Sequence, residues 1–366
     1  MKTLTQILSH SNSRLIIWVF IFLFPFLFIW QDGDLTDTGY NLSVYHFFFE
    51  RLNLGVTDSL IFLTEWIGGL WLKAFPSLGI LGIKLLAVSV YFINIYLSWR
   101  ILKDLFPKNK FIPFFILPAV IFCLRAFPIV FNYDLLTSFF LILFIFLIRK
   151  GEKSLTNSNI AVLGLISAAM MLARFPNIFI LVVFPAFLLI AHLLKLIHLP
   201  IRKYFQILCL YMLSFGIGTL FFFLVLKNLG WYKIFLNNFL NLTNLFADNN
   251  ESYNIFFVLN RYFLDTIYFL LYFIATCILF FSFKFASQKW NKTILFSSLF
   301  LLFLCILSFY PFVFNYNNSV KYITPALIII PFIAYKASKK TAFIALLLLF
   351  LMLIQIAGSN TGIFLK

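Results

Sequence analysis

The chain has 366 residues, of which 63% are hydrophobic and only 11% charged, and its mean hydropathy is +1.01. A soluble globular domain carries about 25% charged residues, so the composition excludes a soluble protein and predicts an integral membrane protein. The net charge of +16 does not indicate nucleic-acid binding, because the basic residues fall in short turns between apolar runs. We therefore expect membrane lipid, and no nucleic acid, among its partners.

Apolar runs of spanning or half-spanning length recur along the whole chain. A hydrocarbon core of about 30 Å needs roughly 20 apolar residues per helix, and shorter segments are tolerated where protein shields them. The predicted fold class is all-α: a polytopic membrane protein with about 11 helices in one transmembrane domain, 1–366. The predicted helices are 15–30, 79–98, 111–124, 133–148, 160–173, 177–194, 204–226, 254–281, 293–310, 322–335 and 341–357.

The basic residues predict which side of the membrane each turn occupies. Cytoplasmic turns carry an excess of Lys and Arg. If the N-terminus is cytoplasmic and the helices alternate, six inside turns hold most of the basic residues and only two acids, Asp104 and Glu152. These turns are 2–14, 100–110, 149–153, 195–203, 284–292 and 336–340.

The loop after the first helix, 31–78, is then on the outer side. It holds six of the 12 acidic residues of the chain: Asp32, Asp34, Asp37, Glu50, Asp58 and Glu65. We expect interfacial helices at 43–52 and 60–75, and Gly68 and Gly69 would let the second approach a neighbour closely. A carboxylate here could act as a general base or hold a divalent cation; alternatively, the loop is merely solvated and helps to orient the protein.

Four stretches, in order, resemble motifs of the GT-C superfamily of membrane glycosyltransferases, in particular the branch of protein mannosyltransferases and aminoarabinose transferases. Asp37-Thr38-Gly39-Tyr40 is similar to the acidic signature after the first helix, and 132–140 to the start of a later helix. The stretch 164–176 resembles a Gly-rich helix that ends in a basic residue and Pro, and 321–331 the entry to a late helix. Thr38 stands where the family has a second acid, and Lys321 where it has Arg.

The resemblance implies an enzyme that moves a sugar from a polyprenyl-phosphate-linked donor to a hydroxyl of a glycan, lipid or protein acceptor. The reaction would take place on the outer face of a bacterial inner membrane. Asp37 would be the catalytic base, with Asp34 as a second acid, and a divalent metal, Mg²⁺ or Mn²⁺, could bridge the two. The implied substrate-binding residues are Tyr40, Arg125, Asp134, Arg174, Lys321 and Tyr322.

Each of these assignments has a structural alternative. Arg125 and Arg174 could extend to the membrane interface, and Asp134, beside Asn132, could cap a helix. The whole chain could instead be a transporter or flippase of lipid-linked substrates. It could also be a non-catalytic assembly subunit that keeps the fold without the activity, a reading that Thr38 favours.

Overall fold

The computed structural model describes residues 11–30, 37–50, 59–107, 110, 112–114, 116–117, 120–121, 129–240 and 339–356. Every regular element in this part of the chain is a helix, as the sequence predicts. The elements are α2 (Ser11–Leu23), η1 (Phe24–Phe28), α3 (Asp37–His46), α5 (Phe62–Ala74), η2 (Pro76–Leu78), α6 (Gly79–Leu105), α8 (Tyr133–Ile148), η3 (Gly151–Ser154), α9 (Asn157–Ala173), η4 (Phe175–Phe179), α10 (Ile180–Leu193), α11 (Ile201–Asn228), α12 (Tyr232–Leu240) and α17 (Lys339–Ile356).

Several of these helices are apolar enough to cross a membrane. Within the described ranges, three are also long enough: Pro76–Leu105, Phe175–Leu193 and Ile201–Asn228. Shorter apolar helices cover Asn12–Phe28, Tyr133–Ile148 and Asn157–Ala173. The structure thus supports a helical membrane protein. The helices predicted at 254–281, 293–310 and 322–335 lie outside the described residues, and 111–124 is described only in part.

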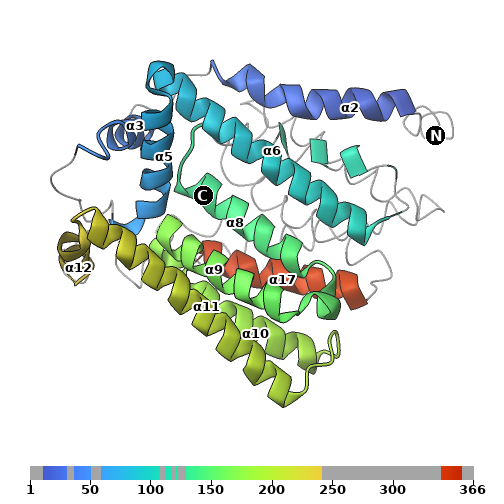
Figure 1. Ribbon diagram of the computed structural model, residues 1–366. Coiled ribbons are helices and arrows are strands. Elements are labelled where there is room, and N and C mark those ends of the chain that lie inside the picture. Colours follow the sequence, from blue (N-terminus) through green and yellow to red (C-terminus); the bar gives the residue numbers. More distant parts are fainter. Residues whose placement is uncertain are drawn as a thin grey trace, which may run out of the picture.

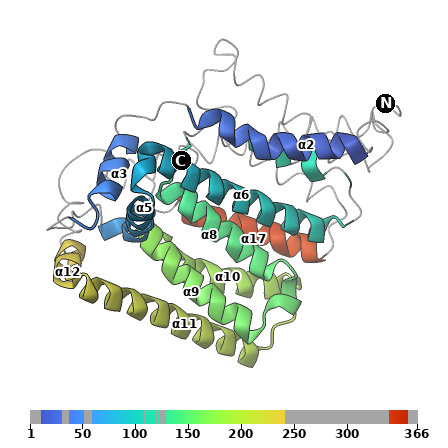
Figure 2. The same cartoon turned by 45° about the horizontal axis from the view of Figure 1, so that its top comes forward.

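The long helices form a bundle in which α8 packs against α6 and α9, α9 against α11, and α10 against α17 (Figures 1 and 2). Phenylalanine fills the space between them. Phe187 of α10 and Phe343 of α17 are both buried, with ring centroids 4.9 Å apart, and Phe184 lies edge-on to Phe144 of α8 at 5.1 Å. Lipid is as apolar as these rings, so close van der Waals packing, rather than escape from water, stabilises the bundle within a membrane.

Small residues let α9 and α11 approach each other closely. A Cβ atom on Gly164 would lie 2.5 Å from the main-chain oxygen of Tyr211, and one on Gly218 would lie 2.8 Å from the Cβ of Ala168. In the same interface the hydroxyls of Ser167 and Tyr211 are 2.7 Å apart and hydrogen bonded. Glycine at these positions is therefore required by the helix spacing.

From α8 to α11, successive helices run in opposite directions, so their connecting turns gather at two ends of the bundle (Figure 1). The ends of α6 and α8 meet the start of α17, where Arg149 Nε donates to Asp104 Oδ2 at 2.6 Å and Lys340 Nζ to the Asp104 carbonyl at 2.8 Å. We call this the basic end, because four of the six predicted basic turns contribute residues to it. The opposite end, with α3, α5, the start of α8 and the end of α9, is called the polar end (Figure 1).

The two loop helices differ in how well the sequence predicted them. The helix expected at 60–75 is α5, Phe62–Ala74. The one expected at 43–52 begins and ends earlier, as α3 at Asp37–His46, and is followed by a turn through 47–50. An acidic residue is favoured at a helix N-terminus and His at a C-terminus, which accounts for a helix that begins at Asp37 and ends at His46.

Candidate functional site

Two long-range hydrogen bonds join the acidic loop to the bundle at the polar end. The hydroxyl of Tyr45 on α3 donates to the main-chain oxygen of Phe131 at 2.9 Å, just before α8. The hydroxyl of Thr64 on α5 donates to the main-chain oxygen of Ala173 at 3.0 Å, at the end of α9. The first three stretches that resemble the GT-C motifs therefore belong to helices that meet at this end.

The close approach expected of Gly68 and Gly69 is confirmed. A Cβ on Gly68 would lie 2.7 Å from ring atoms of Tyr45, and one on Gly69 would lie 2.8 Å from the Cβ of Phe48. Helices α3 and α5 consequently pack face to face, and Tyr45 becomes 1% exposed. The glycines thus set the depth at which the Tyr45 hydroxyl enters the protein.

Glu65 is an acid of the loop that was not predicted from the sequence as a site residue. It is 0% exposed and lies on the face of α5 that also buries Phe62, Gly69 and Leu72. Burial first, and the nearby Glu65 carboxylate second, raise the pKa of the Tyr45 hydroxyl well above its ordinary value. The i, i+3, i+4 spacing from Phe62 to Leu72 could have revealed Glu65, because it places this acid on the apolar side of the helix.

Arg174 and Asp134 form an ion pair beside this group. Arg174 Nη1 lies 3.8 Å from Asp134 Oδ1, with the two side chains 5% and 31% exposed. The guanidinium also lies over the ring of Tyr133, 5.9 Å from its centroid. Arg174 is thus packed inside the protein and paired, rather than extended along the surface as an interfacial arginine would be.

The alternative that Asp134 caps a helix is wrong, because the capping residue of α8 is Asn132. The side chain of Asn132 accepts the hydrogen bond of the Leu135 amide at 2.9 Å and is the N-cap of α8. Asp134 lies in the first turn, where the helix dipole favours a negative charge, and its carboxylate points toward Arg174 at ion-pair distance. Asp134 therefore contributes its negative charge to the polar end through its ion pair with Arg174.

The other predicted site residues are placed only in part. Tyr40 is on α3, 46% exposed, and its main-chain oxygen accepts a hydrogen bond from the Ser43 hydroxyl. Asp37 begins α3, about 12 Å along the helix from Tyr45 at 1.5 Å per residue, but its side chain is outside the described residues. Asp34, Arg125, Lys321 and Tyr322 lie wholly outside them. Their roles stay predictions.

The prediction of a divalent metal rests on Asp34 and Asp37 and is untested for the same reason. Among the residues that the structure describes, no three His, Cys, Asp or Glu side chains lie together as metal ligands.

The arrangement at the polar end combines three chemical functions. A buried carboxylate, Glu65, lies near a neutral tyrosine hydroxyl, and a buried arginine, Arg174, pairs with an acid, Asp134. Carboxylates can accept protons and guanidinium groups can bind phosphate. Comparison with protein-family models, curated proteins and solved structures finds no match to the chain.

Proposed function

We propose that the protein is a membrane glycosyltransferase that transfers a sugar from a polyprenyl-phosphate-linked donor to an acceptor hydroxyl. The observation that carries the proposal is the pair of hydrogen bonds Tyr45–Phe131 and Thr64–Ala173. They attach the acidic loop to the stretches containing Asp134 and Arg174. The GT-C resemblance requires an acidic first loop and a later basic residue to share one site, and this attachment supports such a site.

The proposed orientation places the polar end on the outer face of a bacterial inner membrane. The basic end holds Lys150, Lys153, Lys203, Lys339 and Lys340, and positive turns remain in the cytoplasm. The polar end is at the opposite ends of the same helices. A donor with an isoprenoid tail would reach it from the bilayer, which explains why the site belongs to a membrane domain.

The reaction divides the polar groups by role. The acceptor oxygen attacks the anomeric carbon of the donor, the bond from that carbon to the phosphate oxygen breaks, and polyprenyl phosphate leaves with the electron pair. Asp37 takes the hydroxyl proton as general base, with Asp34 nearby in sequence. Arg174 stabilises the charge that develops on the departing phosphate, aided by Arg125 and Lys321.

Glu65 has a positioning role in this scheme. The proposed base, Asp37, begins α3 about 12 Å along the helix from Tyr45, and proton removal is assigned to it rather than to Glu65. Glu65 instead holds a negative charge beneath α3 and beside Tyr45. It thereby acts on the buried hydroxyl of Tyr45, and Asp37 remains the proposed general base.

The test is a transfer assay in membranes that contain the full chain. Radiolabelled hexoses and pentoses linked to undecaprenyl phosphate are supplied, and release of undecaprenyl phosphate is measured. We expect Asp37→Asn to lower the rate by about 100-fold or more, as loss of a general base does. Glu50→Gln is the matched control, because Glu50 is an exposed acid of the same loop, and it should leave the rate unchanged.

Two outcomes would count against the proposal. Full activity in Asp37→Asn would remove this residue from the mechanism. Movement of the intact donor across a vesicle membrane, with no release of undecaprenyl phosphate, would favour the transporter alternative.

A further inference from the structure

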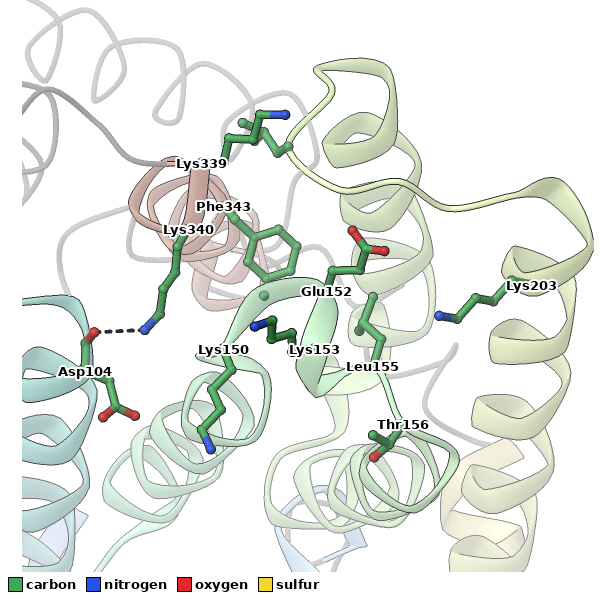
Figure 3. A pocket seen from close by; sticks show the side chains of 12 residues that line it. Asp104, Lys150, Glu152, Lys153, Leu155, Thr156, Lys203, Lys339, Lys340 and Phe343 are labelled. Carbon is green, nitrogen blue, oxygen red and sulfur yellow. Dashed lines mark hydrogen bonds between the residues drawn. The ribbon is translucent and has the colours of Figure 1, made fainter.

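A polar cavity lies at the basic end, at the opposite end of the bundle from the proposed transfer site (Figure 3). Its volume is about 940 Å³, which is within the range of small-molecule sites. It is bordered by the ends of α6 and α8, by η3 and by the starts of α9, α11 and α17. Five lysines line it: Lys150, Lys153, Lys203, Lys339 and Lys340.

The two acids of this cavity are already engaged by other groups. Asp104 Oδ2 accepts a 2.6 Å hydrogen bond from Arg149, which offsets its charge. Glu152 Oε2 accepts from the main-chain amide of His198 at 3.0 Å. Lys340 donates to the Asp104 carbonyl, an uncharged oxygen, so its charge is not neutralised. The cavity therefore keeps an excess of positive charge.

The remaining four lysines have no partner within the described part of the chain. The side chains of Lys150, Lys153, Lys203 and Lys339 make no hydrogen bond or ion pair with another described residue. Figure 3 shows that Lys153, Lys203 and Lys339 come from three separate elements around one space. Like charges gathered in this way repel one another unless an anion lies between them.

Helix direction adds to the positive potential. Two helices begin at the cavity: α9 after Thr156, and α11 with Lys203 in its first turn. A helix N-terminus carries a partial positive charge and favours anions, so lysine there is placed against the dipole. The arrangement costs free energy in the empty protein, and a bound anion would recover it.

We infer that this cavity is a binding site for a phosphate-bearing anion with two or more negative charges. Lysine binds phosphate as a point charge without demanding a planar ligand, and several lysines on different elements suit a ligand with spread charge. Helix α11 is 28 residues long, about 42 Å at 1.5 Å per residue and longer than a hydrocarbon core of about 30 Å. Its lysine-bearing start would thus reach the level of lipid headgroups.

Two kinds of ligand carry this chemistry: a lipid headgroup with two phosphates and a soluble polyphosphate. The purified full chain is therefore assayed by thermal melting in phosphatidylcholine nanodiscs, in nanodiscs that also contain cardiolipin, and with inorganic pyrophosphate. Stabilisation by cardiolipin alone identifies a lipid headgroup, and stabilisation by pyrophosphate identifies a soluble anion. No stabilisation by either probe overturns the site.

Matched variants separate the cavity from general surface charge. The double substitution Lys153→Gln/Lys203→Gln removes two charges from the cavity, whereas Lys195→Gln/Arg202→Gln removes two exposed charges next to it. We expect the first pair to weaken binding of the stabilising probe by about ten-fold or more, and the second to leave it nearly unchanged. Equal weakening by both pairs would mean that the probe binds only to the general positive surface, and the inference would be wrong.

Discussion

The hydroxyl of Thr64 donates a hydrogen bond of 3.0 Å to the main-chain oxygen of Ala173, the residue directly before Arg174. Thr64 itself directly precedes the buried Glu65. One bond therefore fixes the place where the acidic loop meets the end of α9. Since Arg174 pairs with Asp134 at the start of α8, three segments far apart in the sequence depend on this contact for their relative positions.

Replacing Thr64 with Val should loosen this junction. The substitution keeps the shape of the side chain but leaves a buried carbonyl without its donor, which costs about 1–3 kcal/mol. We expect a lower melting temperature in detergent and a reduced transfer rate. The control is Ser43→Ala, which removes the exposed hydrogen bond from Ser43 to Tyr40 on α3 and should change the melting temperature much less. Equal effects of the two would show that the Thr64 bond does not hold the site together.

The Arg174–Asp134 pair should behave as a coupled unit. Arg174→Gln leaves the Asp134 carboxylate facing a group without charge, and Asp134→Asn leaves a guanidinium that is 5% exposed without its acid. Each single change should destabilise the protein by about 1–3 kcal/mol. The double variant should lose less than the sum, because it leaves neither charge behind. Strict additivity in this double-mutant cycle would contradict the pairing.

A further substitution of Arg174 separates its proposed role in phosphate binding from its role in stability. If it also binds the departing phosphate, Arg174→Lys should keep the charge and most of the stability but lose the planar fork. We therefore expect a larger fall in transfer rate than in melting temperature. A matched fall in both would assign Arg174 to structure alone.

Much of the fold was accessible from the sequence because its determinants are local. Long apolar runs predicted most of the helices that the structure describes, and lysines in turns predicted the end at which four of the six basic turns meet. Both signals depend only on nearby residues. Gly68 and Gly69 predicted a close helix contact for the same reason: a missing Cβ is visible in the sequence itself. The sequence did not indicate that the residue in contact with Gly68 is Tyr45.

The site was less accessible, because burial of an acid depends on which surfaces meet. The loop predicts an exposed acidic segment, and Asp37 stands out in it as part of a motif. Glu65 becomes buried only when α3 covers α5 and Thr64 reaches Ala173, 109 positions along the chain. Phe62 and Leu72, which lie on the same face of α5, indicate that Glu65 is buried. Nothing in the nearby sequence indicates that a tyrosine hydroxyl lies close to it.

The α9–α11 interface offers a prediction on packing within the bundle. Gly164→Ala would place a Cβ 2.5 Å from the Tyr211 main-chain oxygen, so the two helices must separate. Overpacking of this kind costs about 1–3 kcal/mol, and the melting temperature should fall. Gly216→Ala is the matched control, because nothing lies within 4 Å of that added Cβ and alanine favours the helix. A fall in melting temperature for Gly216→Ala as large as for Gly164→Ala would contradict the packing.

Tyr45 predicts a specific pH dependence at the polar end. Burial first, then the negative charge of Glu65, raise the pKa of its hydroxyl well above the value of 10.0 that the unfolded chain keeps. Above pH 10 the unfolded state therefore binds fewer protons than the folded state, and stability falls as pH rises toward the folded pKa. The contribution is fully present below pH 10, and its loss approaches about 1.4 kcal/mol per pH unit.

Melting curves from pH 8 to pH 11 on the wild type and Tyr45→Phe test this sign. At pH 8 the variant should be less stable, because it lacks the 2.9 Å bond to the Phe131 carbonyl, which costs about 1–3 kcal/mol. Above pH 10 the gap should narrow, since phenylalanine has no proton to lose. Tyr40→Phe alters a tyrosine that is 46% exposed, and its curve should run parallel to that of the wild type. A gap for Tyr45→Phe that stays constant up to pH 11 would mean that Tyr45 titrates normally and that Glu65 does not act on it.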